Sequence, residues 1–314
     1  MTLSTYAFEE CTSLQYIQLP QSLQNIAHSV FRNCSALKEI VIPEGIKYVS
    51  ENCFSGCKAL TDVVLPESIL EIYGSAFSYC ISLSNINLPK TIHTIMNKAF
   101  YGCSSLGEIV MPEHVVEVSN YLFYGCNALR SVVLPGLVTS IGSYAFSHCS
   151  SLESINLPPS ITSINDSAFS YCSSLESIDL PLSITSIGQH TFESCCALKS
   201  VDLPEKINSI TAGLFTDCHM LESVKAPVGV KTIYYSSNYV TSNPFHNCTS
   251  LKELILLSET PLTSSGQESL GTYLLNTSHP ELQIKVPASA VEAYKSAMLW
   301  SPYADQIVAI EPES

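Results

Sequence analysis

Two stretches of the chain are almost identical. Residues 145–165 read AFSHCSSLESINLPPSITSIN and residues 168–188 read AFSYCSSLESIDLPLSITSIG, so the second copy follows the first almost directly. The same offset continues along the chain, because phenylalanines recur at one constant interval from Phe8 and Phe31 to Phe215, and Phe245 follows after a longer interval. Self-similarity at a fixed period of this length is typical of solenoid proteins.

The repeating unit reads A-F-x-x-C-x-x-L-x-x-I-x-L-P-x-x-I-x-x-I-x-x-x, and the chain carries eleven copies of it. In every copy Cys follows Phe at the third position and Leu follows Cys at the third, while Pro is present in ten of the eleven. The period of 23 is shorter than that of helical repeats, about 33–47 residues, and fits leucine-rich repeats of about 20–29 residues. The sequence therefore predicts a repeat solenoid.

Each copy contains one predicted strand. In the motif LESIDLP, Ile178 and Leu180 alternate with Ser177 and Asp179, which is the period of a β-strand. Pro181 has no backbone N–H and should end the pairing of that strand. One copy cannot bury its apolar side alone, so we expect stacked copies to bury columns of Phe, Cys, Leu and Ile.

The unit A-F-x-x-C…L-x-x-I-x-L-P…I-x-x-I resembles the BspA-like leucine-rich repeat of bacterial surface proteins, over residues 3 to about 256. The tail IKVPASAVEAYKSAMLWSPYADQIVAI (284–310) is similar to the C-terminal cap of such proteins from Bacteroides and its relatives. The resemblance implies a right-handed leucine-rich-repeat superhelix of strands, loops and short turns. It implies a solenoid domain over residues 1–256 and a small strand-helix cap over residues 257–314.

A cap would cover the apolar end of the last repeat. Pro287 can open a helix that continues over residues 288–297. Val291, Tyr294 and Met298 fall at i, i+3 and i+7, and we expect them to form the buried stripe of this helix. The single tryptophan, Trp300, is expected to pack there as well.

Thirteen cysteines could indicate a disulfide scaffold, but eleven of them occupy one position of the repeat. Stacked copies hold these side chains parallel with Cβ atoms about 5 Å apart, whereas a disulfide requires about 3.8 Å. We therefore expect a column of free thiols that pack as small apolar side chains. Cys53, which replaces the usual Ala, is expected to be buried, and Cys196 to lie nearer to solvent.

No motif for catalysis, a cofactor or a metal is visible. The eight histidines form no H-E-x-x-H, no C-x-x-C pair occurs, and G-x-S-x-G, the P-loop and G-x-G-x-x-G are absent. Catalysis by Cys and His would need one thiol to differ from ten equivalent ones. The sequence thus predicts a protein that is not an enzyme and holds no cofactor.

Composition excludes some partners. The net charge of −14 argues against nucleic acids and anionic membranes as main partners, since an acidic surface repels phosphates. No apolar run approaches the ~20 residues that span a bilayer. The segment MTLSTYAFEE shows no signal peptide, yet Leu3 already occupies the position of the second Ile of a preceding copy. We therefore expect a leader, an anchor or further repeats outside this chain.

One insertion breaks the period. It falls within YYSSNYVTSNPF (234–245), where the interval between Phe215 and Phe245 exceeds the regular one, and the copies on both sides keep their register, so the extra residues should loop outward. Insertions in repeat proteins map to surface loops that often bind partners, and Tyr and Asn suit recognition. A tolerated insertion without function is the alternative. The candidate binding residues of this loop are Tyr234, Tyr235, Asn238 and Tyr239.

The outward positions of the predicted strands form a second candidate surface. Asn156, Asp179 and Asp202 occupy the same position of successive copies, and no Lys or Arg occurs between Arg130 and Lys199. This polar ladder could contact a basic partner, a sugar or a loosely held cation. The alternative is that charge on an exposed sheet only prevents aggregation.

The family resemblance implies a secreted or cell-surface module that adheres to a host or neighbouring-cell protein, or to a glycan. Two alternatives stay open at this point. The solenoid could be a structural spacer that presents another domain, or a surface that captures carbohydrate.

Overall fold

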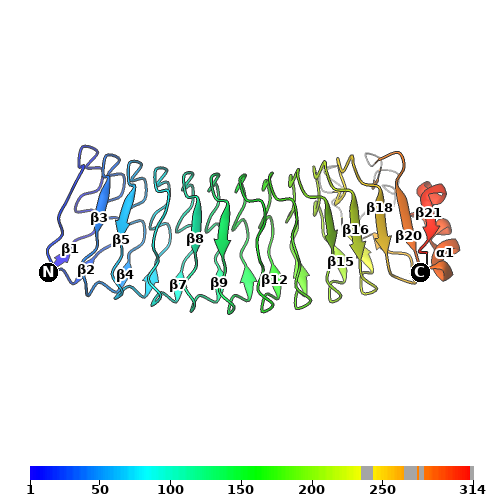
Figure 1. Cartoon of the computed structure of the whole chain (residues 1–314), viewed down its shortest axis with the longest axis horizontal. Helices are drawn as coiled ribbons and strands as arrows, with labels where there is room; N and C mark the ends of the chain where they lie inside the picture. The colour runs from blue at the N-terminus through cyan, green and yellow to red at the C-terminus, as the bar shows by residue number, and fades with distance from the viewer. Residues whose placement is uncertain (235–242, 265–273, 276–278, 312–314) are drawn as a thin grey trace. The chain divides into compact units, whose positions relative to one another are not determined.

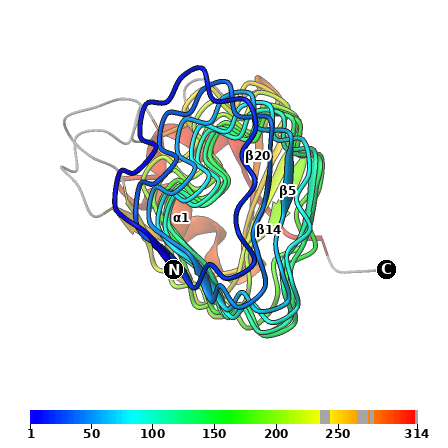
Figure 2. The ribbon, with the colours of Figure 1, turned by 90° about the vertical axis from the view of Figure 1, so that its left-hand side faces the viewer.

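The computed structural model describes residues 1–234, 243–264, 274–275 and 279–311. The chain forms two compact units, unit 1 (residues 1–160) and unit 2 (residues 161–314). Each unit is a leucine-rich-repeat β-solenoid, as the sequence predicts, with one turn for each repeat copy (Figure 1). Viewed end-on, the turns of a unit follow nearly the same path, which places equivalent residues above one another (Figure 2).

Unit 1 carries two ladders of short strands, and their strand pairs are parallel. The first ladder forms at the I-x-L part of the repeat. Its strands are β3 (Glu39–Val41), β5 (Asp62–Val64), β8 (Glu108–Val110) and β10 (Ser131–Val133). Paired residues such as Ile40 and Val63 are one repeat apart in the chain, so the sequence period is also the sheet register.

The second ladder lies at the end of the I-x-x-I segment and was not predicted from the sequence. Its strands in unit 1 are β1 (Thr2–Leu3), β2 (Asn25–Ile26), β4 (Tyr48–Val49), β6 (Glu71–Ile72), β7 (Thr94–Ile95), β9 (Glu117–Val118) and β11 (Ser140–Ile141). Two-residue strands leave no alternation to read in a sequence. Leu3 pairs with Ile26, which confirms the register expected for Leu3.

Unit 2 repeats this plan. Its first ladder consists of β14 (Ser200–Asp202), β16 (Ser223–Ala226), β18 (Glu253–Leu256), β20 (Gln283–Val286) and β21 (Ile307–Ala309). Its short strands are β12 (Ser163–Ile164), β13 (Ser186–Ile187), β15 (Ser209–Ile210), β17 (Thr232–Ile233) and β19 (Thr263–Ser264). Because β18 pairs with β20 and β20 with β21, the sheet extends past residue 256 as far as β21. The domain boundary at residue 256 stays a prediction.

The C-terminal segment is helical after β20. Pro287 precedes η3 (Ala288–Ala290), which leads into α1 (Val291–Ser296), and η4 (Ser301–Gln306) follows. Tyr294 and Trp300 are buried in edge-to-face contact, and the Trp300 indole N–H donates to the Leu262 carbonyl at 2.9 Å. These contacts confirm the packing expected for Trp300.

The expectation that Met298 is buried was wrong. Its side chain is 66 % exposed. The helix ends at Ser296 and Ala297 adopts extended backbone angles (φ −73°, ψ 136°), so the helical spacing that would bring Met298 onto the face of Tyr294 is interrupted.

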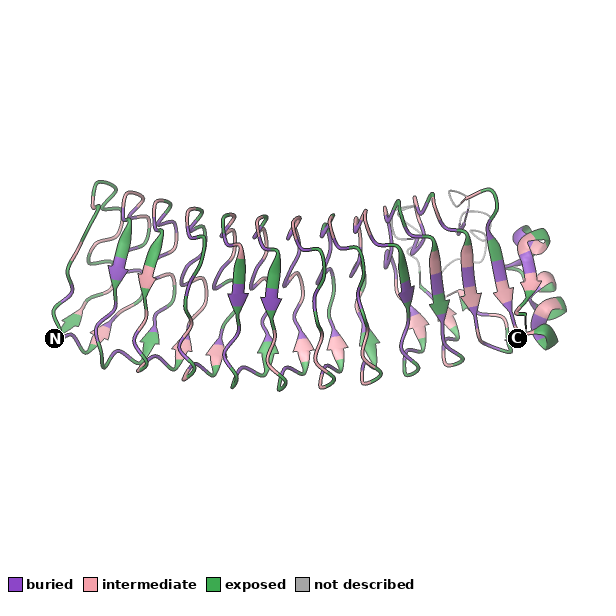
Figure 3. Cartoon of the chain, in the orientation of Figure 1, coloured by how far each residue is buried: buried purple, intermediate pink, exposed green. Residues whose placement is uncertain are grey.

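Stacked phenylalanines form the core of each unit, inside the strands that Figure 3 shows with alternating burial. In unit 1 the rings from Phe8 to Phe146 follow one another at centroid distances of 5.4–5.8 Å and are within 17° of parallel. In unit 2 the rings from Phe169 to Phe245 follow at 5.8–6.0 Å. Offset stacking of this kind is a favoured aromatic geometry.

Most turns pass through the left-handed backbone region twice, two residues before and two residues after their Phe. Tyr121 and Gly125 flank Phe123 in this way, with φ of 57° and 72°, and Tyr144 and His148 flank the next Phe. This region suits Gly and, less well, Asn and Asp, and disfavours bulky side chains. The fold therefore requires a positive φ at two positions of most repeats.

Candidate binding surfaces

The cysteine column is buried from Cys34 onward, as predicted, and its thiols also donate hydrogen bonds. In unit 1 each Sγ lies 3.0–3.2 Å from the carbonyl oxygen of the Phe of the preceding turn. The same bond links the turns of unit 2, from Cys195 to Phe169 and from Cys218 to Phe192. All thirteen cysteines are free, Cys53 is buried and Cys196 is half-buried.

Burial makes these thiols poor nucleophiles. Desolvation raises the pKa of Cys34 to about 11 and that of Cys103 to about 12, and raises the pKa of Cys80 and Cys126 well above the ordinary value. Because the thiolate is the reactive form, the column stays protonated and inert at neutral pH. Desolvation also raises the pKa of Cys196, ahead of the effect of the Asp217 carboxylate.

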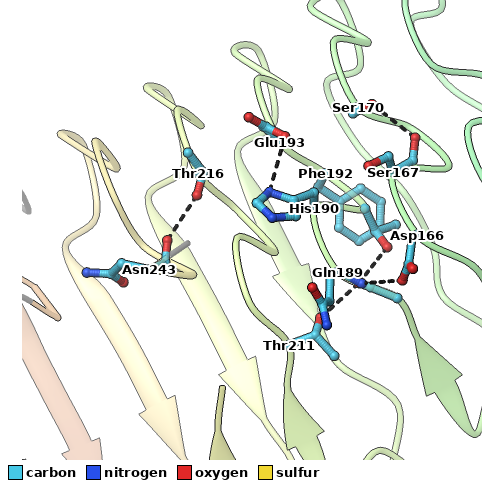
Figure 4. A network of polar contacts seen from close by, with 12 residues as sticks. Asp166, Ser167, Ser170, Gln189, His190, Phe192, Glu193, Thr211, Thr216 and Asn243 are labelled. Carbon is cyan, nitrogen blue, oxygen red and sulfur yellow. Dashed lines mark hydrogen bonds and ion pairs between the residues drawn. The ribbon is translucent and has the colours of Figure 1, made fainter. Parts of the chain in front are cut away.

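One His–Glu pair resembles part of a catalytic site. His190 Nδ1 lies 3.2 Å from a Glu193 carboxylate oxygen (Figure 4). The ring, however, fills the space beside Gly213, where an added Cβ would lie 2.2 Å from Nδ1. The surrounding hydrogen bonds join adjacent turns. The Gln189 backbone N–H donates to the Asp166 carboxylate at 2.8 Å, and the Thr211 hydroxyl donates to the Gly188 carbonyl at 2.8 Å. This network therefore supports the stacking of turns.

The structure places the predicted loop residues only in part. Tyr234 follows β17, is 45 % exposed, and donates its backbone N–H to the Ile210 carbonyl at 2.8 Å. Tyr235, Asn238 and Tyr239 lie outside the described residues. The binding role of this loop stays a prediction.

The predicted polar ladder runs over Asn156, Asp179 and Asp202, and all three residues are exposed. Asp202 ends β14 and its strand partner is Lys225 of β16. Both line a shallow groove with the exposed Leu182. The row of polar and acidic residues is therefore followed by a lysine in the turn after Asp202. The role of this ladder as a binding site stays a prediction.

A third surface, in unit 1, was missed by the sequence analysis. Six aromatic rings contact one another in a continuous cluster along successive turns, and we call this cluster the tyrosine patch. Its members are Tyr79, Tyr101, Tyr121, Tyr124, Tyr144 and His148. They occupy three different positions of the repeat, so no column of identical residues marks them in the sequence. The signal that the sequence did offer was a higher frequency of Tyr within two residues of the Phe in consecutive copies.

Two parallel stacks form the centre of the tyrosine patch. The rings of Tyr101 and Tyr124 lie 4.7 Å apart and within 6° of parallel. Those of Tyr121 and Tyr144 lie 4.8 Å apart and within 7°. Lys98 Nζ lies 5.2 Å from the centroid of Tyr121, within the range of a cation–π contact.

Two structural absences hold for the described ranges 1–234, 243–264, 274–275 and 279–311. There, no group of three or more His, Cys, Asp or Glu side chains could hold a metal ion. No helix in these ranges is long and apolar enough to cross a membrane.

The chain has the features of a leucine-rich-repeat solenoid: parallel ladders of strands, buried columns of Phe and Cys, and one turn of backbone for each repeat. The chain matches the model of the BspA type leucine rich repeat region (6 copies) over residues 1–130 and 116–243, and it belongs to this family. No curated protein matches the chain.

Solved structures with a similar fold come from several bacteria. A leucine-rich repeat protein from Bacteroides ovatus is 24 % identical, over 91 % of this chain and 87 % of that chain, with a TM-score of 0.47. A leucine rich cell surface protein from Faecalibacterium prausnitzii is 22 % identical, over 81 % and 86 %, with a TM-score of 0.46. A leucine rich repeat protein from T. pallidum is 32 % identical over 51 % and 74 %, with a TM-score of 0.44.

Proposed function

We propose that this chain is a non-enzymatic binding module of a cell-surface or secreted leucine-rich repeat protein, which adheres to a host protein, a matrix component or a neighbouring cell. One observation carries the proposal. Turn after turn, the same Phe, Cys, Leu and Ile residues are buried, while the outward positions differ from copy to copy. A constant interior with a variable exterior suits recognition of a large partner.

The chemistry of the described residues supports a binding role over catalysis. The most nucleophilic candidates, the column thiols, are buried and carry a raised pKa. The His190–Glu193 pair packs against the next turn beside Gly213 and has no thiol or hydroxyl nucleophile bonded to its ring in the described part of the chain. Turnover of any substrate by this chain alone would overturn the non-enzymatic assignment.

The proposal is tested by binding of the full chain to purified matrix proteins and to a glycan array. Saturable binding to a matrix or cell-surface protein supports adhesion. Replacement of Tyr234, Tyr235 and Tyr239 by Ala should then weaken binding if the inserted loop contributes, and an unchanged affinity would discard the loop as the site.

Carbohydrate capture is a second candidate, favoured by the shallow groove that contains Asp202, Glu205 and Lys225 beside Leu182. Polar groups that converge next to an apolar wall are a common arrangement at ligand sites. Oligosaccharide binding that is lost in Asp179→Ala and Asp202→Ala would favour this function over protein adhesion. If the chain binds neither the purified matrix proteins nor any glycan on the array, a role as a structural spacer would be favoured instead.

A further inference from the structure

The tyrosine patch occupies backbone positions that disfavour tyrosine. Tyr79, Tyr121 and Tyr144 adopt φ of 58°, 57° and 57°, in the left-handed region. The position of Tyr79 is held in other turns by residues that fit this region better, such as Asn33 and Gly56. A bulky residue at positive φ is uncommon and less favourable than Gly or Asn there. Stacking of the turns therefore does not explain the choice of tyrosine.

Burial does not explain this choice either. Tyr79 is 51 % exposed, and the other five rings are only half-buried. Side chains that pack within the interior of a turn, such as Phe100 and Phe123, are fully buried. The patch is thus an aromatic surface that is preformed by ring–ring contacts and remains open to solvent. Preformed aromatic surfaces bind at low entropic cost, because few rotamers have to be fixed on binding.

The sign of the local charge is opposite to that of the whole chain. The segments that carry the patch, residues 73–81, 96–104, 119–127 and 142–150, contain no Asp or Glu, and Lys98 is their single Lys or Arg. The chain as a whole has a net charge of −14. Four adjacent turns whose patch segments lack a carboxylate, next to one lysine, suit an anionic partner better than a cationic one.

Ring geometry points to the same partner. The faces of Tyr101 and Tyr124 cover one another, as do those of Tyr121 and Tyr144. Mutual stacking covers one negative face of each of these four rings, while the positive ring edges are not used by the stacks. Desolvation, together with the hydrogen bond that the Tyr101 hydroxyl donates to Tyr79, raises the pKa of Tyr101 to about 12. Hydroxyl donors and ring edges both favour carboxylate oxygens.

We propose that the tyrosine patch is a docking surface for an acidic segment of a partner protein, in which a partner carboxylate pairs with Lys98 and neighbouring apolar side chains pack on the ring edges. This inference rests on the proposed binding function and adds to it the site and the chemistry of the partner. A sugar ring would need an open aromatic face to stack on, and the paired stacks leave fewer of these.

The test uses a phage-displayed library of random peptides, selected on the full chain. Enriched peptides should carry Asp or Glu next to apolar or aromatic residues. A synthetic peptide with the enriched sequence should bind at least tenfold more weakly to Lys98→Glu and to the double variant Tyr121→Asn/Tyr144→Asn. Replacement of the peptide carboxylate by Lys should restore part of the binding to Lys98→Glu. Asn is favoured at positive φ, so the Tyr→Asn variants should keep their melting temperature.

The matched control is Tyr6→Asn, which replaces another exposed tyrosine of unit 1 at φ 62° outside the patch and should leave peptide binding unchanged. Enriched peptides that bind all variants equally, or that lack acidic residues, would overturn the docking surface and leave the general binding function standing. Glycan binding that is lost in the same patch variants would replace the protein partner by a sugar.

Discussion

Cys103 Sγ lies 3.1 Å from the carbonyl oxygen of Phe77 and donates a hydrogen bond to it across two successive turns. The same oxygen accepts the backbone N–H of Cys80 at 3.2 Å, so both of its acceptor positions are used. The recurring thiol of the repeat therefore fills space and also completes the bonding of a buried carbonyl.

Replacement of this thiol separates the two roles. Cys103→Ala removes volume and the donor, and we expect a loss of about 1–2 kcal/mol in the free energy of unfolding. Cys103→Ser retains a donor and should lose less. Urea unfolding of both variants makes the comparison. A serine variant that is less stable than the alanine variant would mean that the thiol acts only as an apolar side chain.

Alkaline pH should destabilise the folded chain. An unfolded cysteine ionises near pH 8.5, whereas burial keeps Cys103 protonated to about pH 12, so above pH 8.5 the unfolded state binds fewer protons than the folded state. Stability that is complete below this pH is then lost as the pH rises towards the folded pKa, at about 1.4 kcal/mol per pH unit for each buried thiol.

The measurement is the urea midpoint between about pH 8 and pH 10. Cys103→Ala removes one titrating group. The free energy of unfolding obtained from the same urea titrations should then fall less steeply with pH, by about 1.4 kcal/mol per pH unit. A midpoint that does not change over this range would contradict the burial of the thiol column.

Thiol reagents should distinguish the two accessible cysteines from the rest. Cys11 is exposed and should react fastest, and Cys196 is half-buried with a raised pKa and should react more slowly. The eleven buried thiols should react only in denaturant, where all thirteen become accessible. Mass spectrometry after brief alkylation at neutral pH counts the labelled sites, and rapid labelling of Cys103 in the native chain would contradict the structure.

The phenylalanine column should contribute strongly to stability. Phe100 is fully buried between Phe77 and Phe123, at 5.6 and 5.8 Å. Phe100→Ala should cost about 3–5 kcal/mol, because it leaves a cavity that the stacked turns cannot close. Phe8 is half-buried and stacks on Phe31 at 5.4 Å, so Phe8→Ala is the matched control and should cost less. Equal losses in thermal or urea unfolding would argue against the column.

Gly213 and His190 should be energetically coupled. An added Cβ at Gly213 would lie 2.2 Å from the His190 ring, at φ 64°. Gly213→Ala should therefore destabilise the chain through both a clash and backbone strain. In a double-mutant cycle, His190→Ala should remove the clash and leave only the strain, so the two losses should be less than additive. Strict additivity would show that the ring moves away without cost.

The features that recur in every copy of the repeat could be predicted from the sequence. Phe and Cys return at the same position of each copy, so their columns, the parallel register of Ile40 with Val63 and the burial of Cys53 were predictable. The tyrosine patch was not, since Tyr101 and Tyr121 occupy different positions of the repeat, and their ring contact follows from the three-dimensional path of adjacent turns. Met298 was misplaced because a helix end at Ala297 depends on local packing, which helical spacing does not reveal.

Because each turn accepts and donates its bonds through the same atoms as the next, a duplication or deletion of the codons of one repeat would leave the interior chemistry of a unit unchanged. Such an event would alter which outward residues become neighbours. Two tyrosines separated by one turn could be brought together, or the tyrosine patch split, in a single genetic step. Evolution can therefore rearrange the exterior of this protein without having to redesign its core.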